Sequence, residues 1–291
     1  MRRKLRLLSA TGLLLLACSN KGTPPKATTG EAATSATTAP STVEAPQVDA
    51  APVASAADAS AEAATTAADP VLDGANFIAQ AKAIYRVAAC GEGDVVPPHI
   101  DAKLVEDHCG ELKPLYAQFK STWMDVAIPY IDKLRPKDLP KQVVYPFGGG
   151  DLLTALATYP DATEFTIMSL ETAGDPRGID GVSTGQLKPA LSLLRQHLGK
   201  LFDKVHSRTV NLELQSQAVL PGEATFSMAA LALYGFQPFA LRYFRFADDG
   251  AIKYYTADEI EKIEKAAKNK GEKELAAKKR IFDNVEIMFR K

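Results

Sequence analysis

Three glycines and an acidic residue follow an apolar segment that is typical of a buried strand. Residues 142–147 form this segment, and Gly148, Gly149, Gly150 and Asp151 come directly after it. Glycines at the end of a strand let the backbone approach a ligand closely. Glu171 lies 21 residues after Gly150, and an acid at about 20 residues from such a turn can accept hydrogen bonds from ribose hydroxyls. This spacing could bind a nucleotide or a related cofactor.

Two further charged residues lie close behind Glu171 in the sequence. Asp175 and Arg177 follow the apolar segment 164–170, and the ends of strands are where α/β proteins place their sites. With Asp151 these side chains could line a polar pocket for a small molecule. The alternative is that Arg177 only neutralises Asp175 in a surface ion pair.

The glycine turn and the later acid together resemble class I methyltransferases, which hold S-adenosylmethionine at such a turn. The resemblance implies that Gly148 to Asp151 and Glu171 would bind S-adenosylmethionine. The chain departs from the pattern at Leu153, where the third glycine is expected, and at Pro146, inside the strand. The alternative is that the glycines only allow a sharp turn and close packing, with no cofactor.

Other chemistries find little support in the residue pattern. The four histidines, His99, His108, His197 and His206, show no metal-binding spacing, so we expect no metal site. No G-x-S-x-G motif offers a nucleophile. The formal net charge of −1 provides no broad basic surface, so we expect no nucleic-acid partner.

The elements that must position these residues predict an α/β fold. A helical N-terminal part, residues 71–136, precedes a Rossmann-like βαβ unit made of strand 142–147, helix 151–159 and strand 164–170. The alternation continues downstream, and Asp249-Gly250 predicts an antiparallel hairpin that joins a mixed sheet. The downstream segments are helix 185–205, strand 209–214, helix 222–234 and strand 239–246.

Capping and breaking residues suggest where several helices begin. Asp73 and Asp101 are candidate N-caps, and Pro114 is a candidate first residue of a third helix. Thr256 and Glu259 have the spacing of a capping box for a later helix. The C-terminal residues 284–291 alternate like a strand, which could lie exposed at a sheet edge and accept a partner, or could be covered by further chain after residue 291.

The first 18 residues have the order of an export signal. Arg2, Arg3, Lys4 and Arg6 precede the apolar residues 13–16, and Ala17-Cys18 ends the segment. This ending resembles the lipobox of bacterial lipoproteins. The resemblance implies that residues 1–17 are a signal peptide and that Cys18 receives a diacylglycerol and palmitate, anchoring the protein to a membrane of the cell envelope. The alternative is an ordinary secretory signal that is cleaved near Ala17.

The segment after the leader lacks the residues that build a core. Residues 18–70 are dominated by Ala, Thr, Ser and Pro and contain no aromatic residue. Such a composition cannot bury enough apolar surface to offset the entropy of ordering, so we expect a disordered tether. Ser19, by analogy with envelope lipoproteins, favours the outer membrane over the inner one. A single α/β domain is then expected over residues 71–291.

The two remaining cysteines lie in the helical part of the domain. Cys90 and Cys109 form an isolated pair, which an oxidising compartment favours as a disulfide. Two free thiols are the alternative.

The stretches Pro160-Asp161-Ala162 and 169–177 resemble uncharacterised lipoproteins of myxobacterial envelopes, from Cys90 to about Lys291. That resemblance implies a location in the cell envelope and a fold, but it implies no activity. Our leading hypothesis is therefore a non-enzymatic, lipid-anchored module that binds a small molecule or an envelope protein. An α/β enzyme with its site at Gly148 to Asp151 is the rival, and a structural envelope component is the third alternative.

Overall fold

The computed structural model describes residues 2–9, 72–146, 151–169, 171–204, 219–268, 277–278 and 280–291. Cys18, the whole of the predicted tether (residues 18–70), the glycines 148–150 and the strand predicted at 209–214 lie outside these residues. The described residues all belong to one compact unit.

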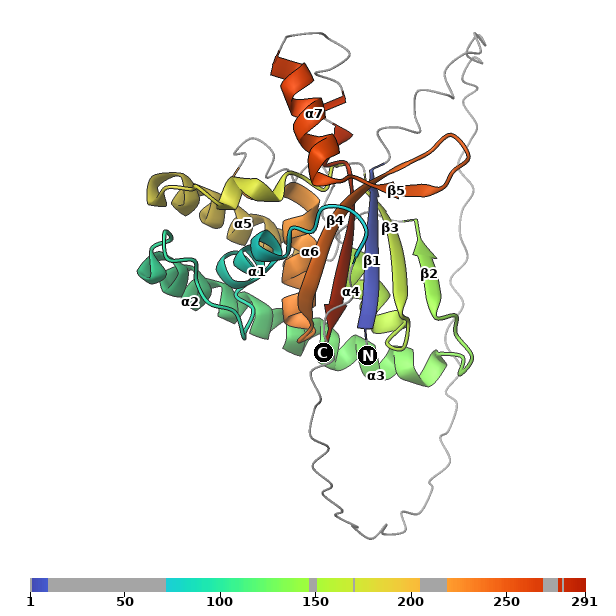
Figure 1. The fold of residues 1–291 in the computed structure, drawn as a ribbon. Coiled ribbons are helices and arrows are strands. Elements are labelled where there is room, and N and C mark those ends of the chain that lie inside the picture. Colours follow the sequence, from blue (N-terminus) through green and yellow to red (C-terminus); the bar gives the residue numbers. More distant parts are fainter. Residues whose placement is uncertain are drawn as a thin grey trace, which may run out of the picture. The chain divides into compact units, whose positions relative to one another are not determined.

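The predicted α/β fold is confirmed, and its centre is a mixed sheet (Figure 1). β2, β3 and β1 are parallel to one another, whereas β6 pairs antiparallel with both β1 and β4, and β5 pairs antiparallel with β4. Across the sheet the strands are β2 (Gln142–Tyr145), β3 (Glu164–Ser169), β1 (Arg2–Ser9), β6 (Asn284–Arg290), β4 (Gln237–Phe246) and β5 (Ile252–Tyr254).

β1 is an element that we did not predict from the sequence, because it is formed by residues that we assigned to an export signal. It lies between β3 and β6, and Arg6 aligns with Thr166 on one side and Glu286 on the other. Leu5 and Leu7 are 0% and 1% exposed and enter the core. The domain that we expected to begin near residue 71 therefore also contains residues 2–9.

The strand predicted at the C-terminus is confirmed as β6, but its predicted position at an exposed edge is wrong. It pairs with β1 on one side and β4 on the other. Val285, Ile287 and Phe289 are each 0% exposed. The alternation of a strand tells which residues share a face, but it does not tell what pairs with the strand's edges.

The predicted hairpin and the predicted capping box are both present. Gly250, with φ +81°, follows the first strand of the β4–β5 hairpin. The Thr256 backbone N–H donates to Glu259 Oε2 at 2.9 Å, and the Glu259 N–H donates to Thr256 Oγ1 at 3.2 Å. These reciprocal bonds start α7, Ala257–Lys268.

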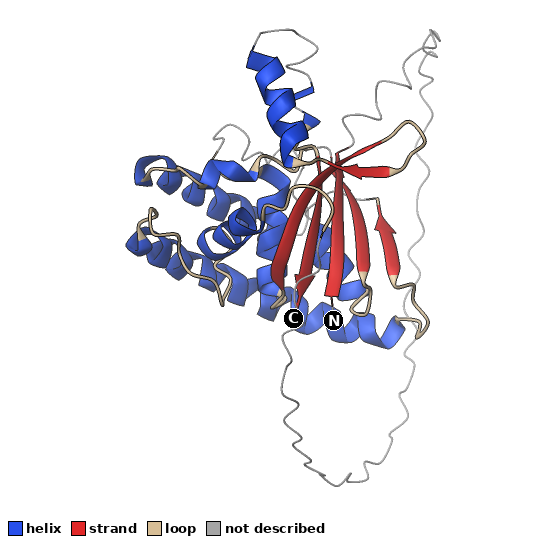
Figure 2. Ribbon diagram, in the orientation of Figure 1, coloured by secondary structure: helices blue, strands red, loops and turns tan. Residues whose placement is uncertain are grey.

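The helices lie beside the sheet (Figure 2), and α4 and α6 are behind it in the view of Figure 1. Asp101 caps α2 as predicted, accepting from the Lys103 N–H at 2.9 Å. Asp73 does not cap α1, because the chain first pairs with β4, where the Phe77 N–H donates to Leu241 O at 2.8 Å. The helices are α1 (Ile78–Val87), α2 (Ala102–Phe119), α3 (Asp125–Leu134), α4 (Leu152–Thr158), α5 (Thr184–Lys204) and α6 (Gly222–Leu233).

The helix predicted to open at Pro114 is wrong. Pro114 lies inside α2, which continues through a π-helical turn, Lys120–Met124, into α3. The rings of Phe119 and Phe202 on α5 are 4.8 Å apart, and this packing stabilises the helix across the proline. Val126 and Tyr130 of α3 are apolar side chains that remain 65% exposed.

One large core cluster joins the sheet to the helices. Residues 222–231 of α6 are buried on every side of the helix, as its apolar composition requires. In the part of the chain that the structure describes, no helix combines the length and the apolar character needed to cross a membrane.

Candidate ligand-binding site

Polar side chains gather where β2 and β3 end. Ser169 is the last residue of β3, and its hydroxyl donates to Glu171 Oε2 at 3.0 Å. The backbone N–H of Glu171 donates back to Ser169 Oγ at 3.1 Å, which fixes the turn. Asp151 immediately precedes α4, after β2. The structure therefore places the predicted residues Asp151 and Glu171 at the carboxyl end of the parallel strands.

Glu223 joins this site although we did not predict it. It lies in the first turn of α6 and is 1% exposed. Among the described residues, neither oxygen of its carboxyl group has a hydrogen-bond partner. A signal was available, since Glu223 is the single charged residue of the apolar segment 222–233.

The loop after β3 holds the first turn of α6 in place. Gly174 has φ +91°, and a Cβ atom there would lie 2.5 Å from the backbone nitrogen of Gly222. The Ala224 N–H donates to Ala173 O at 3.1 Å, and the Tyr243 hydroxyl donates to Gly174 O at 2.6 Å. Only glycine allows this close approach, so the loop that carries Glu171 also sets the position of Glu223.

The surroundings of Glu223 favour its neutral form. Burial, followed by the negative charges of Glu171 and Asp151, raises its pKa to about 8. Ser169 opposes the shift, but its hydroxyl proton is already donated to Glu171. The site therefore combines two partly exposed acidic side chains, Asp151 and Glu171, with a buried carboxyl group whose protonated form is favoured at neutral pH.

This arrangement suits a ligand with cationic or hydrogen-bond-donating groups. Asp151 and Glu171 can face such a group with negative charge, while Glu223 can accept or donate a hydrogen bond. Within the described ranges, no group of three or more His, Cys, Asp or Glu side chains is arranged to hold a metal ion.

Asp175 and Arg177 form a second cluster instead of joining this one. The Arg177 guanidinium lies 2.6 Å from Asp175 Oδ2 and 2.7 Å from Glu264 Oε1 on α7. It also stacks over the Phe282 ring, with its Cζ atom 4.8 Å from the ring centroid. Hydrogen bonds from Arg177 to both carboxylates raise its pKa, opposed by burial. The ion-pair alternative is therefore the one that the structure favours, with α7 as the partner element.

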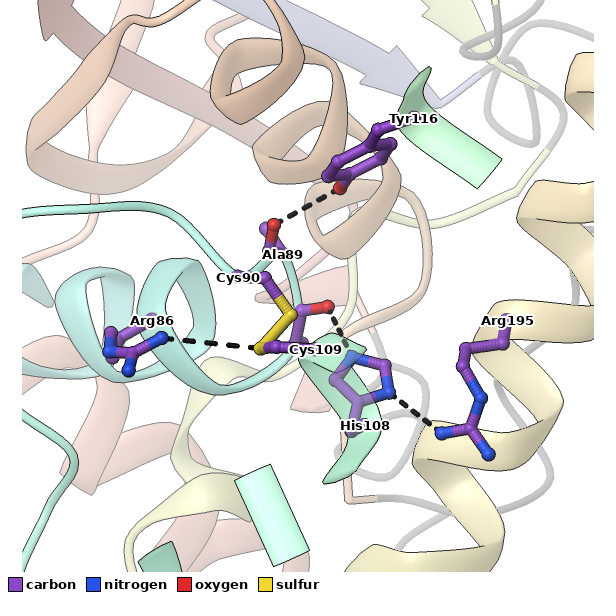
Figure 3. Close-up of a disulfide and its surroundings, with 8 residues drawn as sticks. Arg86, Ala89, Cys90, His108, Cys109, Tyr116 and Arg195 are labelled. Atoms are coloured by element: carbon purple, nitrogen blue, oxygen red, sulfur yellow. Dashed lines mark hydrogen bonds between the residues drawn. A yellow bond between two sulfur atoms is a disulfide. The ribbon is translucent and has the colours of Figure 1, made fainter. Parts of the chain in front are cut away.

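The predicted disulfide is present in the helical part of the domain (Figure 3). The Sγ atoms of Cys90 and Cys109 are 2.05 Å apart, and their Cα atoms are 5.5 Å apart. Cys90 follows α1 and has φ +56°, in the left-handed region. The Tyr116 hydroxyl, which donates to Ala89 O at 3.1 Å, further ties this end of α1 to α2.

His108 lies beside the disulfide and is a neutral structural residue. Its Nε2 lies 2.9 Å from Ala88 O, which can only accept, so Nδ1 accepts from Arg195 at 2.8 Å. Burial, with a smaller contribution from the charge of Arg195, lowers the pKa of His108 to about 4. His108 and Arg195 border a groove of about 640 Å³ between α2 and α5, which charged side chains of both signs line.

The glycine turn at Gly148, Gly149 and Gly150 lies outside the described residues, so the site is built from Asp151, Ser169, Glu171 and Glu223.

No protein-family model, curated protein or solved structure matches this chain. The fold and the site chemistry therefore carry the functional argument.

Proposed function

We propose that this chain is a lipid-anchored protein of the cell envelope whose α/β domain binds a small cationic ligand without transforming it. The binding residues are Asp151, Glu171 and Glu223. The observation that carries the ligand proposal is the buried carboxyl group of Glu223, which has no hydrogen-bond partner among the described residues and lies beside two other carboxyl groups.

A buried polar group without a partner destabilises a fold by about 1–3 kcal/mol. A fold that keeps such a group next to two partly exposed acids gains from a ligand that donates hydrogen bonds to all three. Cationic ligands gain further from the charge of Asp151 and Glu171, because charge-assisted hydrogen bonds are stronger than neutral ones.

The ligand proposal is tested by calorimetric titration with spermidine, free arginine and choline as cationic probes and citrate as an anionic one. We expect at least one cation to bind, and Glu171→Gln and Asp151→Asn to weaken it about tenfold each, because each removes one charge-assisted contact. Glu264→Gln, in the Arg177 cluster, is the matched control. Equal affinity in all variants, or no binding of any cation, would contradict the proposal.

The anchor proposal rests on the leader sequence and on Cys18. It is tested by labelling cells with radioactive palmitate. We expect label in the wild-type chain and none in the Cys18→Ala chain. Equal labelling of both chains would contradict the proposal that Cys18 carries a lipid anchor.

An enzymatic role is the second candidate, and the pKa of Glu223, about 8, favours it. General acids and bases work best when their pKa lies near the operating pH. An enzyme would lose turnover in Glu223→Gln while keeping its affinity for the ligand. A non-catalytic module would show no chemical change in the bound ligand, which mass spectrometry of the recovered probe measures.

A further inference from the structure

The outward face of α3 carries a row of large apolar side chains. Val126, Tyr130 and Leu134 are each 65% exposed, and they follow one another at steps of four residues along the helix. Residues four apart lie on the same side of a helix, so these three form one continuous row. α3 lies at the bottom of the view in Figure 1. Single exposed apolar residues are common on protein surfaces, but a contiguous row of them indicates an interaction site.

The domain does not use this row to build its core. No residue of α3 is buried, and the helix contacts α4 in the part of the chain that the structure describes. Ile128, on the side of the helix opposite Val126, is partly buried and packs against the core cluster. The row itself therefore faces solvent and is accessible to a partner.

The spacing of the row favours an identical helix as that partner. Side chains four residues apart form a ridge on a helix, and in the commonest packing of two helices such a ridge of each helix fits into a groove of the other. A pair with two-fold symmetry uses the same patch on both chains, so the row would meet its own copy. Tyr130, the middle residue, would then lie closest to the axis, where two aromatic rings can pack together.

The charges beside the row are complementary to those of a second copy. Asp125 lies in the first turn of α3 and Lys133 in the last turn, about 12 Å apart along the helix axis. Both are exposed, and neither forms an ion pair within the described ranges, whereas Asp132 pairs with Arg135. An antiparallel pair of helices brings Asp125 of each chain towards Lys133 of the other. A parallel pair would bring like charges together, so charge favours the antiparallel orientation.

An anionic lipid surface fits this face less well than a second copy does. Helices that lie on membranes carry mainly Lys and Arg around their apolar side chains. Asp125 and Asp132 are both exposed on α3, and they would approach head groups of the same sign. In a pair of chains, Asp125 instead meets a cation.

We propose that α3 forms an antiparallel pair with the α3 of a second copy of this chain, with Tyr130 near the two-fold axis and Asp125 of each copy facing Lys133 of the other. This pairing goes beyond the proposed ligand binding and anchoring, and it depends on neither. One helix from each chain makes a small interface, so we expect a weak dimer with a dissociation constant on the order of 10–100 µM.

Sedimentation equilibrium of the full-length Cys18→Ala chain, which cannot be lipidated at that position, tests the pairing. We expect its mean mass to rise from that of a monomer to that of a dimer as the concentration increases through the range of the dissociation constant. Leu134→Glu places a charge in the row and should weaken the dimer by about tenfold or more. Val144→Glu is the control, because Val144 is 71% exposed but lies on β2.

The urea midpoint at a concentration where the chain is a monomer should be the same with and without Leu134→Glu, because the side chain faces solvent there. This measurement shows that the variant still folds. A Cys18→Ala chain that stays monomeric at all concentrations, or a dimer that Leu134→Glu leaves unchanged, overturns the proposal.

Exchanging the two charges tests the orientation of the pair. Asp125→Lys and Lys133→Asp should each weaken the dimer, because each variant places like charges at both contacts. An equimolar mixture of the two variants should restore it, since each substituted residue then faces one of opposite charge in the other chain. A mixture that associates no better than its components excludes the antiparallel pair.

Flotation with vesicles of phosphatidylcholine and phosphatidylglycerol separates a second copy from a lipid surface. We expect Leu134→Glu to leave the vesicle binding of the Cys18→Ala chain unchanged, because the row pairs with protein and not with lipid. A chain that remains monomeric and loses its vesicle binding in Leu134→Glu would assign the row to a membrane and overturn the proposal.

Discussion

At the residue scale, two buried glutamates show how neighbours decide the state of a carboxyl group. Glu223 and Glu286 are 1% and 0% exposed. Burial opposes ionisation of Glu286, but hydrogen bonds from Arg242 and Tyr254 and the charge of Arg6 outweigh it and hold its pKa below the ordinary value. Among the described residues no cation pairs with Glu223, and its pKa rises to about 8. The first carboxyl group is held in ion pairs of the sheet, and the second is the group that we propose contacts a ligand.

The raised pKa of Glu223 predicts a dependence of stability on pH. The folded chain keeps the proton of Glu223 up to about pH 8, whereas the unfolded chain loses it near the ordinary pKa of about 4.3. The contribution is therefore fully present below the unfolded value and is lost as the pH rises towards 8. Since one pKa unit corresponds to about 1.4 kcal/mol, we expect a loss of a few kcal/mol between pH 5 and pH 8, measured by urea unfolding.

Glu223→Gln should flatten this dependence, because glutamine does not titrate. Glu261→Gln is the control, since Glu261 is an exposed residue paired with Lys265. A pH dependence that is the same in Glu223→Gln and in the unsubstituted chain would show that Glu223 is not the group responsible.

At the element scale, the disulfide fixes the end of α1 to the middle of α2. The bond closes a loop with a sequence separation of 19, and the contact of His108 with Ala88 reinforces the same junction. The sequence predicted this bond from the isolation of the two cysteines. Only the structure shows that Cys90 reaches Cys109 with a positive φ.

Replacing both cysteines by serine should lower the free energy of unfolding by about 3 kcal/mol, because the unfolded chain regains the freedom of that loop. Urea unfolding of the Cys90→Ser/Cys109→Ser chain measures the loss. Adding a reducing agent to the unsubstituted chain should produce the same midpoint. A double variant as stable as the parent would contradict the assigned role of the bond.

At the scale of the whole molecule, one ionic network joins four neighbouring strands, from Glu164 of β3 to Arg242 of β4. Arg6 of β1, Glu286 of β6 and Arg242 of β4 form a line of ion pairs, and the Arg242 guanidinium also stacks on Tyr254 of β5, with its Cζ atom 3.8 Å from the ring centroid. The network joins the parallel and antiparallel halves of the sheet on the face opposite the residues Leu5 and Ile287.

Glu286→Gln should destabilise the full-length chain by about 3–5 kcal/mol, because removing one partner leaves the buried Arg242 charge without compensation. The free energy of urea unfolding checks this value, with Lys265→Gln as a control that breaks an exposed pair. A loss below about 1 kcal/mol, typical of a surface pair, would mean that water replaces the lost carboxylate.

Sequence patterns alone were enough to predict the α/β class, the β4–β5 hairpin, the capping box at Thr256 and the Cys90–Cys109 bond. Each of these depends on residues that are close in the chain or on a pairing with a single solution. Hydrophobic alternation, turn residues and capping spacing are local properties, and they can be found without knowing the fold. The positions of Asp151 and Glu171 after β2 and β3 could be predicted for the same reason, whereas their role in binding stays a prediction.

Only the tertiary structure decided which strands are neighbours and which acids are buried together. It placed residues 2–9 beside β3, moved β6 from the expected edge to the interior of the sheet, and brought Glu223 next to Glu171. These contacts join residues that are far apart in the sequence, and no local pattern specifies the partner. Pairing of strand edges and burial of charge depend on what the rest of the chain leaves unsatisfied.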